Sequence, residues 1–288
     1  KLFLYLSENT DFSFGINSMI ENRLGGDMKY VEGKGDEEHS YFERNKTQRH
    51  SSQLTFEHRF DNQNRLNVKN SITYFSRKIE IPDFEFDGNQ LSSFSEVSYI
   101  HTKEKTEWVT GANVWTDKFT EKKLTDFPVR DYNMTTFGLF VQNNTKITDW
   151  MNLETGLRTD YITDYGFAVL PRISSHFKIT EKFSSRIGGG FGYKAPTIFS
   201  EDSERIQFQN VLPIDDDINK LERSYGANVD FTYKTGLFND QVFLSINQLF
   251  FYTYLKNPLE LQSADNNRWQ FNNIDGHVDS KGAETNMK

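Results

Sequence analysis

The chain has 288 residues, of which 15% are aromatic, a net charge of -8 and no cysteine. The acidic balance disfavours nucleic acid as a partner, because phosphates need a basic surface, and the lack of cysteine excludes disulfides and thiolate metal sites. No stretch approaches the roughly 18 consecutive apolar residues of a membrane helix, whereas a membrane-spanning β-strand needs only about 9–11 residues. Phe, Tyr, Thr, Ser and Asn are abundant without a helical period, which favours an all-β protein.

The first part of the chain predicts hairpins that are joined alternately by short and long connections. Strands are expected at 2–7, 12–21, 51–60, 65–74, 92–101 and 107–117. The polar segments 25–50, 78–90 and 119–130 are expected to be loops. In the fourth strand, Leu66, Val68, Ile72 and Tyr74 alternate with Arg65, Asn67, Lys69 and Thr73. A period of two indicates a strand with one apolar and one polar face.

The middle of the chain carries the clearest pattern. Four strands are expected at 136–147, 150–161, 166–179 and 182–194, with almost nothing between them. In the second of these, Met151, Leu153, Leu157 and Tyr161 share one face, and Asn152, Glu154, Arg158 and Asp160 share the other. A long irregular stretch, 195–221, follows. A further hairpin is expected at 223–233 and 241–254 across a turn at 235–239, then a loop at 257–267 and two last runs at 268–274 and 281–288. The total is 13 or 14 strands.

The alternation of short and long connections predicts a sheet with loops at one end only. Outer-membrane barrels have this asymmetry, with short periplasmic turns and longer extracellular loops. Aromatic residues gather near the expected strand ends, among them Phe60, Tyr74, Tyr132, Tyr161 and Phe167, as in interfacial girdles, although sheet-core aromatics give the same pattern. We therefore predict an antiparallel, up-and-down transmembrane β-barrel. Charged residues of the polar faces would line its lumen: Lys69, Glu154, Arg158 and Asp230.

Four short motifs, in order along the chain, resemble TonB-dependent outer-membrane receptors of the ferric-siderophore branch. They are Asn22-Arg23-Leu24-Gly25-Gly26-Asp27, Gly192-Tyr193-Lys194-Ala195-Pro196-Thr197, Lys220-Leu221-Glu222-Arg223-Ser224-Tyr225-Gly226 and Ser280-Lys281-Gly282-Ala283-Glu284. The resemblance covers nearly the whole chain. It implies a barrel of about 22 strands, so residues 1–288 are interpreted as one partial barrel domain from the middle of a receptor. The plug domain, the TonB-binding box and the C-terminal strands would be absent.

The resemblance also implies a function and candidate sites. A receptor of this family sits in the outer membrane among lipids, binds a scarce iron chelate such as a siderophore at its loop face, and admits it when TonB acts on the plug. No residue would be catalytic. Ligand-binding candidates follow the Ala-Pro signature, with a solvated loop as the alternative: Tyr193, Glu201, Glu204, Arg205 and Gln207. Family members that take up haem usually carry a histidine in this loop. None lies between Pro196 and Glu222, which disfavours haem.

No cofactor or metal site is predicted. The acidic runs 36–39 and 215–217 lack the alternating spacing of a calcium loop, and the six histidines are scattered. Two other classes of protein stay open. A passive porin-like channel of about 14 strands would close unaided. A secreted carbohydrate-binding β-protein would be soluble and carry paired carboxylates in a cleft, and the sequence shows no such pair.

Overall fold

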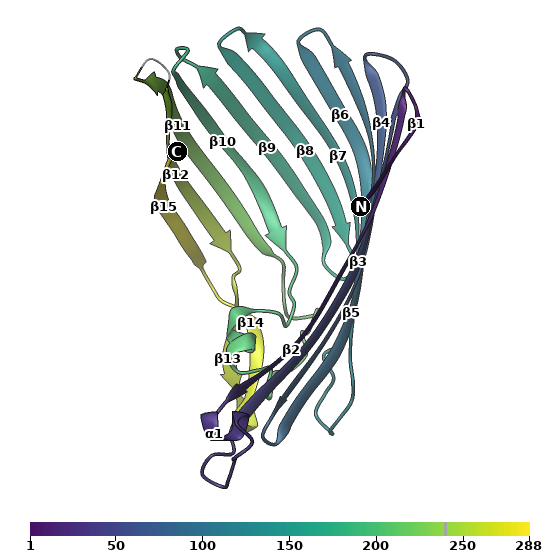
Figure 1. The fold of residues 1–288 in the computed structure, drawn as a ribbon, viewed down its shortest axis with the longest axis vertical. Helices are drawn as coiled ribbons and strands as arrows, with labels where there is room; N and C mark the ends of the chain where they lie inside the picture. The colour runs from purple at the N-terminus through teal and green to yellow at the C-terminus, as the bar shows by residue number, and fades with distance from the viewer. Residues whose placement is uncertain (239–240) are drawn as a thin grey trace.

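The computed structural model describes residues 1–238 and 241–288 and has one large antiparallel sheet (Figure 1). Thirteen strands pair in the order β1 to β12 and then β15, so each strand up to β12 lies beside its neighbour in the sequence. The strands are β1 (Leu2–Ser7), β2 (Thr10–Gly26), β3 (Phe42–Arg59), β4 (Asn64–Ile81), β5 (Phe84–Lys103), β6 (Thr106–Glu121), β7 (Tyr132–Thr148), β8 (Met151–Ile162), β9 (Gly166–Lys178), β10 (Phe183–Lys194), β11 (Glu222–Leu237), β12 (Val242–Lys256) and β15 (His277–Met287). The all-β, up-and-down prediction is confirmed. Among the described strands, β1 and β15 each pair on one side only, so the sheet does not close.

The sheet has two unlike faces. We call the inner face the one that carries Arg77, Ile79 and Phe86, because the loop between β10 and β11 packs against it. The pairing register carries this assignment from strand to strand. The opposite, outer face bears a band of exposed apolar side chains, which include Ile16, Ile20, Ile72, Val97, Phe137, Leu139, Leu157, Val169 and Ile187. An outward apolar band is typical of barrels whose strands face lipid.

The two ends of the sheet differ as predicted. At the upper end in Figure 1 the turns are short, at 8–9, 60–63, 104–105, 149–150 and 179–182. At the lower end lie the long connections 27–41, 122–131, 195–221 and 257–276, and two short ones at 82–83 and 163–165. Two short helices occur there, α1 (Met28–Val31) and α2 (Glu201–Arg205). No helix among the described residues is long and apolar enough to cross a membrane.

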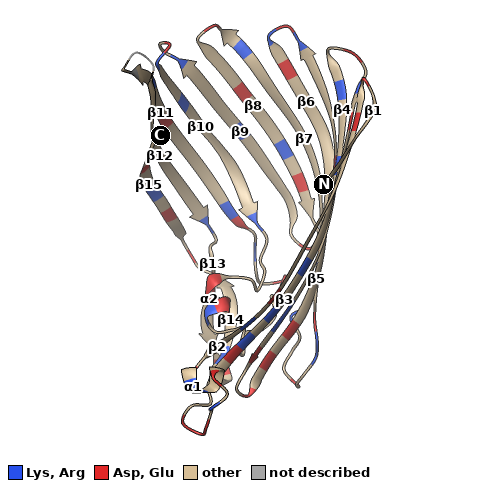
Figure 2. Cartoon of the chain, viewed as in Figure 1, with Lys and Arg blue, Asp and Glu red and all other residues tan. Residues whose placement is uncertain are grey.

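The predicted loop at 25–50 is right only for 27–41, and the one at 78–90 only for 82–83, because β2 to β5 extend past their expected ends. β4 and β5 continue to a two-residue turn, Pro82-Asp83, in which Asp83 has a φ of 61°. Proline fixes the first corner of such a turn, and aspartate tolerates the left-handed conformation at the second. Figure 2 shows charged residues crowding these lower parts of β2, β3 and β5.

The physical reason for the error is an inversion of polarity. In the lower part of β4, Ile79 and Ile81 lie on the inner face and are buried, whereas Lys78 and Glu80 lie on the outer face. The period of two continues, but the apolar side chains now point inward because a loop covers them there. The sequence of such a stretch resembles that of a loop, because the face that is apolar in the rest of each strand is charged here.

The expected loop at 257–267 and the expected strand at 268–274 need a second correction. The short strands β13 (Leu259–Ala264) and β14 (Arg268–Asn273) pair with each other as a separate sheet. β14 is therefore not part of the large sheet. It lies against the loop after β10 instead, through a parallel bridge between Val211 and Trp269. The expected turn at 235–239 also differs, because β11 continues to Leu237, and Asn239 lies outside the described residues.

Candidate functional site

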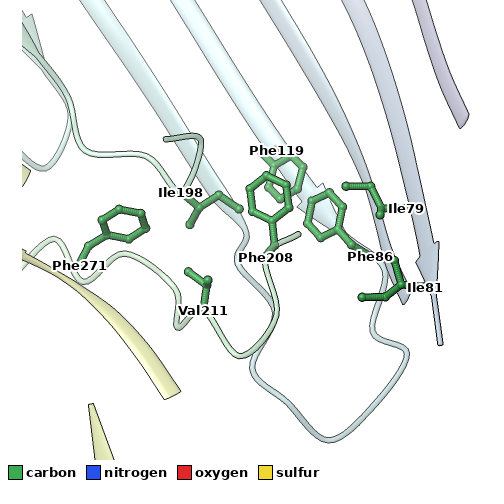
Figure 3. Packing of buried hydrophobic residues seen from close by; sticks show 8 residues of the cluster. All are labelled: Ile79, Ile81, Phe86, Phe119, Ile198, Phe208, Val211 and Phe271. Carbon is green, nitrogen blue, oxygen red and sulfur yellow. The ribbon is translucent and has the colours of Figure 1, made fainter. Parts of the chain in front are cut away.

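The connection 195–221 crosses the inner face at the loop-bearing end, and we call it the strap. It begins where Pro196, which has no N–H to continue a ladder, follows the end of β10. Its helix α2 is capped by Ser200, whose hydroxyl accepts from the N–H of Ser203. The strap brings apolar side chains onto β4, β5 and β6, and β14 adds one more (Figure 3). The buried cluster consists of Ile79, Ile81, Phe86, Phe119, Ile198, Phe208, Val211 and Phe271.

Phe208 is at the centre of this cluster and is completely buried. Its ring stacks on Phe86 with centroids 4.5 Å apart, and Phe199 meets it edge-on at 5.8 Å. Phe199 in turn packs edge-on against Phe119 at 5.1 Å. Burying one phenylalanine side chain contributes about 1.5–3 kcal/mol, so these rings hold the strap on the wall. Tyr132, expected in an interfacial girdle, instead stacks on Phe119 inside the cluster.

A buried ion pair fastens the strap at the same point. Arg130 and Glu121 expose only 3% and 9% of their side-chain surface. The Arg130 Nε donates to Glu121 Oε2 at 2.7 Å, and the Arg130 backbone N–H donates to the same oxygen at 2.9 Å. The guanidinium also donates to the carbonyl oxygen of Phe208 and lies 5.1 Å from the centre of the Phe86 ring. Because it joins the β6–β7 connection to the strap, this pair fixes the two loops relative to each other.

The four candidates on the strap are divided between two roles. Glu204 accepts a hydrogen bond from Arg77 Nη1 at 2.6 Å, and Gln207 donates to a carboxylate of β3 at 3.2 Å. Both therefore attach the strap to the wall. Glu201 and Arg205 form an exposed pair within α2, at 2.6 Å. These two side chains are exposed to solvent.

Tyr193 lies just before the strap, where the pairing of β9 with β10 has ended. The last pair of that ladder is Gly190 with Arg172, next to Pro171. The Tyr193 hydroxyl donates to Asp160 Oδ2 at 2.8 Å, although Asp160 is on β8. Tyr193 therefore bridges a gap in the wall rather than pointing into solvent.

Asp160 is only 1% exposed and receives two further hydrogen bonds. The Arg158 Nε donates to its two carboxylate oxygens at 2.7 and 2.9 Å. Arg158 Nη2 also donates to Asn113 Oδ1 at 3.2 Å. The structure thus brings Tyr193 and Arg158 together through Asp160, a link that the sequence analysis did not make.

The expected lumen-lining residues all lie on the inner face. Asp230 is opposite Arg186 in the register of β10 and β11 and accepts a weak hydrogen bond from Asn247 at 3.4 Å. The others form ion pairs between or along strands, namely Lys69–Glu96 at 3.6 Å, Glu154–Arg172 at 3.3 Å and Arg158–Asp160 at 2.7 Å. Away from the strap cluster, the inner face therefore carries charged side chains, and three of the four expected residues are in these opposite-sign pairs.

The acidic runs have local structural partners. Asp36 accepts backbone N–H groups of Glu38 and His39 in a turn. Asp216 lies near Tyr165, where burial first, and then the charges of Asp216 and Asp164, raise the pKa of the tyrosine to about 12. In the described part of the chain, no three or more histidine, aspartate or glutamate side chains gather as a metal site would require.

Comparison with known families decides the classification. Residues 2–288 match the family described as TonB dependent receptor-like, beta-barrel. The chain belongs to this family. The comparison with curated proteins gives no match.

Solved structures of the receptor family share the fold. The siderophore receptor PirA from Pseudomonas aeruginosa aligns with a TM-score of 0.71 at 14% identity, over 99% of this chain and 51% of that one. The siderophore receptor PirA from Acinetobacter baumannii aligns with 0.72 at 14%, over 99% and 49%. The alcaligin receptor FauA from Bordetella pertussis aligns with 0.69 at 12%, over 99% and 48%. This receptor chain therefore spans about half the length of the solved structures that it matches.

The residues that fasten the strap of this receptor barrel were missed by the sequence analysis. Glu121 and Arg130 both fall in the segment 119–130 that was expected to be a loop, and nothing in their spacing indicates a pair. Phe86 lies two residues after Phe84 in the lower part of β5. Its position on the inner face could therefore have been predicted from the period of two. Asp160 was placed on the polar face, but not as the partner of Tyr193.

Proposed function

We propose that this chain forms the wall and several ligand-side loops of an outer-membrane receptor that takes up a scarce iron chelate, such as a siderophore. The observation that carries the proposal is the strap. It packs on an apolar part of the inner face at the loop-bearing end, whereas farther from the strap the inner face carries ion pairs and the outer face presents an apolar band. A ligand that arrives from outside would meet Glu201 and Arg205 first, and then the ion pairs of the inner face.

The family and its solved members support this choice of ligand. PirA is described as a siderophore receptor, and FauA as the receptor for alcaligin. Other solved members extend the range of cargo, because OprC is described as a copper transporter. The polar, paired charges of the inner face suit passage of a hydrophilic chelate, and no bond-making step is part of the proposal.

The energy source is proposed to be TonB, acting on a plug. We infer that residues 1–288 form one partial barrel domain, with the plug, the TonB-binding box and the remaining strands supplied by other parts of the protein. The half-length coverage of the solved receptors supports this, as does the unpaired edge of β1 and of β15. Unpaired edges are not stable in lipid, where backbone N–H and C=O groups find no water.

The test is uptake of radioactive iron from defined siderophores by bacteria that express the full-length protein and lack their own receptors. Uptake is expected for at least one siderophore, and deletion of the host's TonB is expected to abolish it. The matched control is a full-length variant with a deleted TonB-binding box, whose surface level is checked by immunoblot. Uptake that persists without TonB would contradict the proposal and favour a passive porin-like channel.

A further inference from the structure

A cavity of about 460 Å³ opens on the inner face at the point where the strap begins. Its floor is made by β6, β7 and β8, and its rim by Leu170 of β9, by residues 192–195 and by Thr197. Cavities of about 300–1,000 Å³ are the usual size for small-molecule sites. It is separate from the strap cluster, because none of the buried residues of that cluster lines it.

The wall of the cavity is partly apolar. Trp115, Met134 and Leu170 line it, and Trp115 exposes 49% of its surface although it points inward. An exposed tryptophan side chain offers a large flat surface that is favourable for an apolar or aromatic group. The cavity therefore suits a ligand with a flat apolar body.

The polar groups of the cavity set the charge of that ligand. The carboxylate of Asp117 already accepts from Gln90 at 2.8 Å and from Ser92 at 2.8 Å. Asp160 is likewise occupied by Arg158 and Tyr193. Because both acids already have partners, they have little capacity left for a donor group of a ligand.

The cationic groups, by contrast, have donors to spare. Arg158 uses Nε and Nη2 for Asp160 and Asn113, and within the described residues its Nη1 has no hydrogen-bond partner. Lys194 exposes 63% of its side chain and is 3.7 Å from Glu222, too far for a strong hydrogen bond. Unused donors beside satisfied acceptors favour a negatively charged ligand.

We propose that this cavity binds a small organic anion with a flat apolar body, such as an aromatic carboxylate, between Trp115 and the cationic groups of Arg158 and Lys194. The anionic group would accept from Arg158 Nη1 and Lys194 Nζ, and the apolar body would lie against Trp115 and Leu170. The proposal goes beyond uptake as such. It rests on the proposed function only in taking the inner face as accessible to ligands.

The test uses the full-length protein in detergent micelles and the fluorescence of its tryptophans. The probe is 4-bromobenzoate, whose bromine quenches a nearby indole, and 4-bromobenzamide is the neutral analogue of the same shape. Saturable quenching by the carboxylate, absent with the amide, is expected. It should disappear in Trp115→Phe, which removes the reporter on the cavity wall.

A matched pair of lysines shows whether the cavity itself is responsible. Lys194→Gln is expected to weaken binding about fivefold, which corresponds to about 1 kcal/mol for an exposed charge. Lys69→Gln removes a similar inner-face lysine, 53% exposed and 3.6 Å from its glutamate, that does not line the cavity, and should leave binding unchanged. The second variant is Arg158→Lys, because Arg158→Gln would leave buried Asp160 without its cation and endanger folding. Arg158→Lys is expected to bind 4-bromobenzoate with a weaker but measurable affinity.

Three outcomes would overturn the inference: no saturable quenching, equal quenching by the amide, or equal weakening by Lys69→Gln and Lys194→Gln. Failure here is distinguishable from failure of the proposed function, because quenching is measured without transport. TonB-dependent iron uptake together with no quenching would reject the cavity alone. Quenching without any TonB-dependent uptake would reject the receptor function and keep the site.

Discussion

Phe208 and Phe86 stack with ring centroids 4.5 Å apart and join the strap to β5 across the inner face. Both side chains are almost completely buried, although the segments that carry them are far apart in the chain. Local sequence gives no hint of the contact. Phe199 and Arg130 also contact these two rings, so several attachments of the strap meet at this point.

Phe208→Ala is expected to release the strap while the sheet stays folded. Removing a buried phenylalanine costs about 3–5 kcal/mol, and here the loss falls on a loop rather than on the strand ladder. Limited proteolysis of the full-length protein should therefore cut within 195–221 many times faster than in the parent. Ile218→Ala is the control, since Ile218 is an exposed residue of the same strap. Equal cutting rates in the two variants would show that the Phe208 ring does not hold the strap.

Replacing one member of the Arg130–Glu121 pair is expected to destabilise the strap more than replacing both members together. Either Glu121→Gln or Arg130→Met leaves a buried polar or charged group without its partner, at a cost of about 3–5 kcal/mol. The double variant should be less destabilised than the sum of the single ones. A double-mutant cycle on the exchange protection of the strap amides measures this coupling. Additive effects would mean that the two side chains act independently.

Gly138→Ala tests the polar network beneath the cavity. A Cβ at Gly138 would lie 2.6 Å from Asp160 Oδ1 and 2.7 Å from Asn113 Oδ1, so the network must shift. We expect a loss of about 1–3 kcal/mol, measured as a lower midpoint of thermal unfolding in detergent. Gly156→Ala is the matched control, because Gly156 is also on the inner face and its nearest neighbouring atom would be 3.7 Å away. A midpoint for Gly138→Ala equal to that of the control would contradict the close packing described here.

The stability of the turn between β3 and β4 should depend on pH because of the charge of Asp61. Hydrogen bonds from the Asn64 side chain, and then from the Gln63 backbone, hold the pKa of Asp61 below its usual value of 3.8. A lowered pKa means that the charged form stabilises the folded turn above pH 3.8, and that this stabilisation is lost as the pH falls through the folded pKa. Above pH 3.8, the amides of this turn should therefore be better protected from exchange in the parent than in Asp61→Asn. This difference should vanish as the pH falls through the folded pKa of Asp61. An advantage that is independent of pH would exclude a role for the charge.

The strands were predictable from the sequence wherever the outer face is apolar. In β7 to β10, alternation such as Met151, Leu153 and Leu157 against Glu154 and Arg158 located the strands and both faces. Where the strap covers the inner face, the apolar residues change sides, and the lower ends of β4 and β5 were interpreted as loop. The pattern Lys78-Ile79-Glu80-Ile81 still has a period of two. What was missing was the knowledge that another segment lies on that side.

The candidate site was predictable only as a region. The Ala-Pro signature located the start of the strap, and the alternation placed Lys69, Glu154, Arg158 and Asp230 on the inner face. The partners of these residues were not predictable, because the links Glu204–Arg77 and Tyr193–Asp160 join elements that meet only after the sheet curves. Whether the candidates bind a ligand stays a prediction.

The strap has a mechanical consequence for the curved sheet. It is continuous with β10 and β11 at its ends, and its middle is held on β4, β5 and β6 by the ring cluster and by Arg130. It therefore connects the β10–β11 part of the sheet with the β4–β6 part across the inner face. Loss of the Phe208 contact would therefore free the middle of the strap while its two ends stay anchored in neighbouring strands of the sheet.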